Sequence, residues 1–238
     1  MTKKGFSHPM YTSEKVFGWI YVVLHVFVMP FLLALGLRAL ARVDIVISDR
    51  YFNLLYYGIG FILIFIFMHH YLKANFYDLC ENKWNTVTAV TTGYLFYYLL
   101  GYLINLVVYT ATGETSNPNN NAVIEAFLEN KNIMFAVAAI MAPIVEEVLF
   151  RGVIFGTVRR KSRLWAYVVS VAAFAVYHLW SYLAFDYDPT LFIEMLQYLP
   201  GGIVLAWAYE RGRNIWAPIV LHMIINFFAL SVSVTFLG

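Results

Sequence analysis

The chain has 238 residues, of which 61% are hydrophobic, 18% aromatic and only 13% charged, and its formal net charge is +2. Soluble domains carry about 25% charged residues, so this composition excludes a water-soluble fold, and the small net charge does not indicate a nucleic-acid partner. The single cysteine, Cys80, excludes an intramolecular disulfide and a cysteine-based metal site.

Apolar stretches of about 20 residues predict transmembrane helices, because that length of helix crosses the hydrocarbon core of a bilayer. The chain contains seven such stretches, and the fourth is unusual because it carries three charges. We therefore expect an all-α fold, a polytopic membrane helix bundle with about seven transmembrane helices. The predicted spans are 16–37, 51–71, 86–110, 133–155, 164–183, 191–209 and 215–236.

The distribution of Lys and Arg predicts the orientation, since positive residues favour the cytoplasmic side of a membrane. With a cytoplasmic N-terminus, the outer connections hold Arg38, Arg42, Arg50 and Lys131. The more numerous positive residues of the inner connections are Lys3, Lys4, Lys15, Lys73, Lys83, Arg159, Arg160, Lys161, Arg163, Arg211 and Arg213. We expect an integral protein of a bacterial cell membrane, with its N-terminus in the cytoplasm.

The longest polar connection is 111–131, which contains a run of Asn residues around Pro118. Asn and Pro favour turns, so we predict an external loop here. This loop divides the chain into an N-terminal part, residues 1–130, with helices one to three, and a C-terminal helical core, residues 131–238, with helices four to seven.

The fourth predicted span contains Glu146, Glu147 and Arg151. Ionisable side chains inside a membrane cost several kcal/mol and are usually paired or functional. On a helix, Glu147 and Arg151 share a face and can form an ion pair. Glu146 points about 100° away from Glu147. It has no local cation, and so it is available as a general base.

Two later spans carry polar groups that could meet Glu146. The fifth span supplies His178, and the seventh supplies His222 and, one turn later, Asn226. His222 and Asn226 share a helix face, so both could donate hydrogen bonds to one point, as an oxyanion site requires. Helix bundles build sites in this way, from side chains on facing helices.

The order of these motifs resembles the CPBP family of intramembrane endopeptidases, which includes CAAX proteases and bacteriocin-processing proteins. Each motif alone is weak, but all three occur in order, each in its own predicted span. The resemblance covers roughly residues 133–230. The residues that carry it are Glu146-Glu147…Arg151, Phe174…His178, Gly201-Gly202, the run 209–216 and His222…Asn226.

The resemblance implies a glutamate protease that cleaves peptide or membrane-protein substrates within the lipid bilayer. Glu146 would deprotonate a water molecule that His178 helps to position. His222 and Asn226 would stabilise the oxyanion, while Glu147 and Arg151 would hold the helix. No cofactor and no covalent enzyme intermediate are implied.

Four alternatives remain open. The charged cluster could be a structural ion-pair network. Two glutamates and two histidines could bind a divalent metal, although the helical zinc motif His-Glu-x-x-His is absent. The chain could be a non-catalytic immunity or regulatory protein that binds a membrane partner. It could also be a transporter with a proton-relay carboxylate, although no second half resembles the first, as inverted repeats would.

Overall fold

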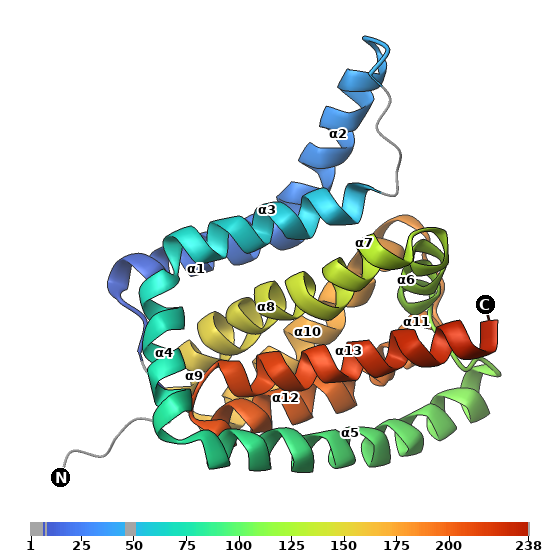
Figure 1. Cartoon of the computed structure of the whole chain (residues 1–238). Helices are drawn as coiled ribbons and strands as arrows, with labels where there is room; N and C mark the ends of the chain where they lie inside the picture. Colours follow the sequence, from blue (N-terminus) through green and yellow to red (C-terminus); the bar gives the residue numbers. More distant parts are fainter. Residues whose placement is uncertain (1–6, 8, 46–50, 238) are drawn as a thin grey trace.

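The structure, a computed structural model, describes residue 7, residues 9–45 and residues 51–237, with side chains up to residue 232. Helices make up nearly all of this part of the chain and no strand occurs in it, which confirms the predicted all-α fold class (Figure 1). In lipid, a helix satisfies its backbone hydrogen bonds internally, which is why an apolar chain of this kind is helical.

The helices follow one another through short connections, and four of the elements are π-helical or 3₁₀ turns inside longer helices. In chain order they are α1 (Thr12–Val23), η1 (Leu24–Val28), α2 (Met29–Ala41), α3 (Phe52–Phe67), α4 (His69–Glu81), α5 (Lys83–Thr112), α6 (Pro118–Glu129), α7 (Lys131–Ala136), η3 (Val137–Met141), α8 (Ala142–Glu147), η4 (Val148–Phe155), α9 (Gly156–Arg159), α10 (Arg163–Phe185), α11 (Leu191–Glu194), η5 (Met195–Tyr198), α12 (Leu199–Gly212) and α13 (Trp216–Leu237).

Within the described residues, five helical stretches are long and apolar enough to cross a membrane. Helices α3 and α4 meet at an angle of 80°, and together they would make a sixth span if they form one broken helix. The seventh predicted span corresponds to α13, whose apolar part with described side chains is Trp216–Val232, shorter than the others. The polytopic helix bundle is therefore confirmed, and the predicted count of about seven is approximate. The five stretches are Thr12–Ala41, Lys83–Thr112, Lys131–Arg159, Arg163–Phe185 and Leu191–Gly212.

The prediction of a loop over the whole of residues 111–131 is wrong, because helix α6 forms in the middle of this connection. Asn117 is the N-cap, and its side-chain oxygen accepts a hydrogen bond from the backbone N–H of Asn120 at 3.0 Å. Pro118 occupies the first turn, where a missing N–H costs nothing. The Asn and Pro residues that suggested a turn thus start a helix.

The stretch from α7 to α9 carries the charged cluster and is the most buried of the five spans. Helices α10, α12 and α13 pack around it, and α5 lies outside α12 and α13 at the edge of the bundle (Figure 1). Between α10 and α12 the approach is close: a Cβ added at Gly202 would lie 2.9 Å from Val171 Cγ1. Glycine therefore permits the contact that brings α12 to the charged cluster.

The connection between α12 and α13 is built from buried hydrogen bonds. Arg213 adopts a left-handed conformation, with φ of 60°, and ends α12. The Asn214 Oδ1 atom accepts the backbone N–H of Ala217 at 3.0 Å and caps α13, while its Nδ2 donates to Thr86 Oγ1 of α5 at 2.9 Å. These contacts fix the start of α13 less than two turns before His222.

The connections predicted to be cytoplasmic lie at one end of the bundle. The α4–α5, α9–α10 and α12–α13 junctions are at the same end as the start of α1 (Figure 1). At this end Glu210 of α12 accepts hydrogen bonds from Arg163 at 3.0 Å and from the Tyr167 hydroxyl at 2.9 Å. The Lys and Arg residues of these three junctions thus lie at one end of the bundle, the arrangement expected of connections on one side of a membrane. Lys3, Lys4 and Arg50 lie outside the described residues.

Candidate functional site

The predicted site residues of the fourth span lie on a helix with two π-helical stretches, Val137–Met141 and Val148–Phe155. Glu146 and Glu147 fall at the end of α8, between these stretches. Both carboxylates are buried, Glu147 completely. π-Helical turns occur often at functional sites because they re-aim the side chains around them.

Arg151 is fully buried and forms the ion pair with Glu147 that the spacing predicted, with 3.0 Å between Nη1 and Oε1. Its Nη2 atom donates to the Gly202 carbonyl oxygen at 3.2 Å. The guanidinium also lies over the ring of Phe174, 4.3 Å from the centroid, a cation–π contact. The charge is therefore surrounded by protein groups, and lipid does not reach it.

Glu147 makes a second contact that the sequence did not predict. Its Oε1 atom lies 2.8 Å from His222 Nδ1. An ionised carboxylate only accepts hydrogen bonds, so the Nδ1–H of His222 donates to Glu147. This bond aims the opposite ring atom, Nε2, at Glu146. Glu147 thus orients His222 in addition to pairing with Arg151.

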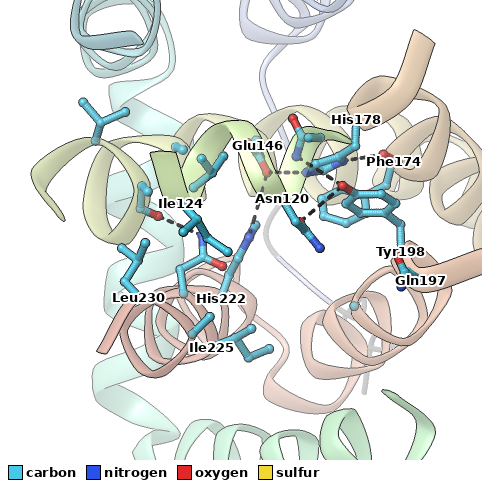
Figure 2. A pocket seen from close by; sticks show the side chains of 18 of the residues that line it. Asn120, Ile124, Glu146, Phe174, His178, Gln197, Tyr198, His222, Ile225 and Leu230 are labelled. Atoms are coloured by element: carbon cyan, nitrogen blue, oxygen red, sulfur yellow. Dashed lines mark hydrogen bonds and ion pairs between the residues drawn. The ribbon is translucent and has the colours of Figure 1, made fainter. Parts of the chain in front are cut away.

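Glu146 faces the two histidines across a cavity (Figure 2). Its Oε2 atom is 3.9 Å from His178 Nε2 and 3.9 Å from His222 Nε2. These separations are too long for direct hydrogen bonds. Three polar atoms from α8, α10 and α13 therefore converge on one point without satisfying one another.

The ring of His178 is held by two aromatic rings and at one nitrogen. It stacks on Tyr198 with centroids 4.3 Å apart and lies 4.5 Å from the Phe174 ring. The His178 Nδ1–H donates to the Phe174 carbonyl oxygen at 2.8 Å. In the neutral ring, Nε2 is then an acceptor, and this is the atom that faces Glu146.

Asn226 lies on the cavity wall, and its amide donates to the backbone carbonyl of Ala138 at 2.8 Å. In the π-helical register around Ala138, this carbonyl would accept the N–H of residue 143. Residue 143 is Pro143 and has no N–H, so Asn226 takes its place. The same nitrogen carries a second N–H, and Asn226 lines the cavity.

The cavity measures about 360 Å³. Among the described residues, the acidic and basic side chains that line it are Glu146, His178 and His222. Helix α6 contributes part of its wall with Asn119, Asn120, Val123 and Ile124. The Tyr198 hydroxyl donates to Asn117 Oδ1 at 2.8 Å, so the ring that stacks on His178 is also tied to the start of α6.

Among the predicted residues, Glu146, His178, His222 and Asn226 line one cavity, while Glu147 and Arg151 stand behind it. Sequence reasoning missed Tyr57 of α3, whose hydroxyl donates to Glu146 Oε1 at 3.0 Å. It also missed Tyr198. With 18 tyrosines in the chain, no local pattern marks these two.

A metal ion would need several ligands close together. Within the part of the chain that the structure describes, no group of three or more His, Cys, Asp or Glu side chains is placed to hold one. The shared Oε1 atom of Glu147 is already bonded to Arg151 and His222. That atom of Glu147 is therefore not available to a metal ion in this geometry.

Comparisons with known proteins confirm the resemblance for the C-terminal part. A family model described as Type II CAAX prenyl endopeptidase Rce1-like matches residues 129–228. A Bacillus subtilis (strain 168) protein named "Putative membrane peptidase YdiL" is 29% identical over 113 residues, which is 47% of this chain and 41% of that protein. The chain thus matches less than half the length of this curated relative. No solved structure matches.

Proposed function

We propose that this protein is an intramembrane endopeptidase in which Glu146 activates a water molecule. The observation that carries the proposal is the position of Glu146 Oε2, 3.9 Å from the Nε2 atoms of both His178 and His222 at the cavity. The match of residues 129–228 to an endopeptidase family supports the same reaction class.

The separation between Glu146 and His178 suits one water molecule that hydrogen-bonds both groups. Because His178 Nδ1–H already donates to the Phe174 carbonyl, His178 Nε2 accepts a hydrogen bond from one O–H of that water. Glu146 Oε2 accepts a hydrogen bond from the other O–H. The oxygen lone pairs then point away from both groups, toward a peptide carbonyl in the cavity.

In the reaction, the water oxygen bonds to the peptide carbonyl carbon, and Glu146 Oε2 takes the released proton. The carbonyl oxygen becomes an oxyanion. The carbon–nitrogen bond then breaks, and Glu146 returns the proton to the leaving amine. Water is consumed, two peptide ends are formed and Glu146 is again ionised.

The oxyanion would be stabilised by the second N–H of Asn226 and by His222. Since His222 Nδ1 donates to Glu147, its Nε2 can donate only when the ring is an imidazolium. The neighbouring carboxylate of Glu147 stabilises that positive charge. Glu147 therefore contributes to the chemistry through His222.

The test is cleavage of a peptide library by the detergent-purified protein, with products mapped by mass spectrometry. Glu146→Gln keeps the shape and removes the base, so cleavage should fall about 100- to 10,000-fold. Glu129→Gln changes an exposed carboxylate at the end of α6 and is the matched control. If a cellular phenotype survives Glu146→Gln, His178→Ala and Asn226→Ala together, the non-catalytic immunity or regulatory role replaces the protease.

We further propose a bacterial cell-membrane location with a cytoplasmic N-terminus. The support is the gathering of positive connections at the end of the bundle where α1 starts. Reporter fusions after residue 115 should read outside and those after residue 161 inside. The reverse pattern would contradict this orientation.

A further inference from the structure

The residues before 129 are not matched by the endopeptidase family model, and one of them, Tyr57, contacts the Glu146 carboxylate directly. The Tyr57 hydroxyl lies 3.0 Å from Glu146 Oε1. An ionised carboxylate has no proton to give, so the hydroxyl must donate its single proton to Glu146. The two oxygens of Glu146 therefore differ: Oε1 is bonded to α3, and Oε2 faces the histidines.

The direction of this first bond sets the direction of those behind it. Since the hydroxyl hydrogen of Tyr57 points to Glu146, its oxygen accepts a hydrogen bond from the Tyr177 hydroxyl at 3.0 Å. The hydroxyl hydrogen of Tyr177 is then used in that bond, so its oxygen accepts a hydrogen bond from His25 Nε2–H at 3.4 Å. With the His25 proton on Nε2, its Nδ1 atom is the nearer acceptor for the Tyr21 hydroxyl, at 3.2 Å, and Met29 Sδ is a weaker second acceptor at 3.5 Å. All four donors point toward Glu146.

His25 is enclosed and held in place by its surroundings. It is fully buried and sits in the π-helical turn Leu24–Val28 of the first span. Its ring stacks on Tyr56 with centroids 4.3 Å apart, and the Tyr56 hydroxyl donates to the His25 carbonyl oxygen at 2.8 Å. A lone histidine on an apolar helix, which the sequence does not explain, thus has a hydrogen-bond partner on each ring nitrogen.

Close helix packing keeps the chain of bonds together. A Cβ added at Gly60 of α3 would lie 2.8 Å from the Tyr21 hydroxyl oxygen and 3.4 Å from His25 Cε1. A Cβ here would displace the Tyr21 hydroxyl, so glycine leaves the space that this hydroxyl occupies between α3 and the first span. Tyr21, at the far end, is 1% exposed, so the chain ends inside the protein and does not carry protons to water.

We propose that Tyr21, His25, Tyr177 and Tyr57 form a positioning chain that fixes the Glu146 carboxylate and leaves Oε2 as its reactive oxygen. This inference rests on the proposed protease function. Because Oε1 already accepts from Tyr57, the proton taken from water goes to Oε2, on the cavity side. The N-terminal helices are thereby part of the catalytic unit, and Tyr57 is its positioning residue.

The decisive variant is Tyr57→Phe, which keeps the ring and removes the hydroxyl. We expect kcat to fall on the order of 10- to 100-fold, the range for a hydrogen bond to a charged group, with KM unchanged. Tyr177→Phe, which removes the second link, should lower kcat less. Tyr71→Phe is the matched control, because it removes a buried hydroxyl bonded to Tyr209 at 2.8 Å, away from Glu146, and should leave kcat unchanged.

A second readout does not depend on proteolysis. In protein labelled with ¹³C-glutamate, the infrared band of the Glu146 carboxyl group is identified by its loss in Glu146→Gln. Tyr57→Phe should shift this band, and Tyr71→Phe should not. If the wild type cleaves no peptide while the shift is present, the protease proposal fails and the hydrogen-bond chain stands.

Two results would overturn the positioning chain. One is a folded Tyr57→Phe protein with wild-type kcat and an unshifted band. The other is a rise in KM at unchanged kcat, since Tyr57 also lines the cavity and would then be a substrate contact only. If Tyr57→Phe does not fold, Tyr177→Phe decides the question by the same two measurements.

Discussion

Helix α5 and the stretch Lys131–Arg159 are of similar length, 30 and 29 residues, and both are apolar enough to cross a membrane. Their surroundings differ: 6% of the apolar window of α5 is buried inside the protein, against 72% for Lys131–Arg159. The exposed side chains of α5 include Leu95 and Tyr102. The helix with the charged cluster is thus surrounded by protein, and α5 presents its apolar side chains outward.

This contrast shows how a membrane protein can hold Glu146, Glu147 and Arg151 within one helix. Each charge is offset by groups from other helices: the Gly202 carbonyl for Arg151, His222 for Glu147 and the Tyr57 hydroxyl for Glu146. Lipid could supply none of these hydrogen bonds. Replacing residues of the buried helix should therefore have larger effects than replacing residues at the edge.

The largest effect on stability is expected from Arg151→Met, which keeps the volume and removes the charge. Glu147 would be left buried without its cation, and breaking a buried pair in this way costs about 3–5 kcal/mol of unfolding free energy. The measurement is unfolding of the detergent-solubilised protein by denaturant. Arg163→Met, at a surface ion pair with Glu210, is the control and should barely move the midpoint. Equal losses of unfolding free energy in both variants would show that the burial of Arg151 does not determine its contribution to stability.

Asn226→Ala tests the cavity side of the same comparison. Removing one oxyanion donor costs about 100- to 1,000-fold in turnover, and KM should hardly change, because the donor acts when charge develops on the oxygen. The variant also leaves the Ala138 carbonyl unpaired, so stability must be measured alongside kinetics. Ser231→Ala on the same helix should cleave at the wild-type rate. Wild-type turnover in Asn226→Ala would remove Asn226 from the mechanism.

Asn117→Ala addresses the helix that covers the cavity. It removes the N-cap of α6 and the acceptor of the Tyr198 hydroxyl, which should destabilise this helix by about 0.5–2 kcal/mol. Hydrogen exchange of residues 118–129 should become faster while exchange in α8 is unchanged. Asn121→Ala, at an exposed position of α6, is the control. Unchanged exchange in Asn117→Ala would mean that packing alone holds α6.

The smallest expected effect is that of a chelator. A mechanism that uses Glu146 and water alone predicts the same cleavage rate before and after dialysis against a chelator. The assay is the peptide cleavage described above, with a known zinc peptidase as the positive control. Loss of activity that zinc restores would favour the metal alternative.

The fold class and the Glu147–Arg151 ion pair could be predicted from the sequence because both depend on residues that are close together in the chain. Apolar stretches of bilayer length predicted the helical membrane bundle, and a spacing of four residues predicted the Glu147–Arg151 ion pair, which is present. The error at α6 has a local cause as well. Asn and Pro favour turns, and they also favour the start of a helix. The residues that follow Asn117 and Pro118 decide between the two.

The sequence by itself determined which residue types enter the membrane and in what order, since composition and helical periodicity are properties of the chain. Only the tertiary structure decided which atom faces which. In it His222 hydrogen-bonds Glu147, and the Tyr57 hydroxyl hydrogen-bonds Glu146. Asn226 donates to the Ala138 carbonyl, which Pro143 leaves without a donor. Such contacts join residues far apart in the chain, and they depend on how closely the helices pack.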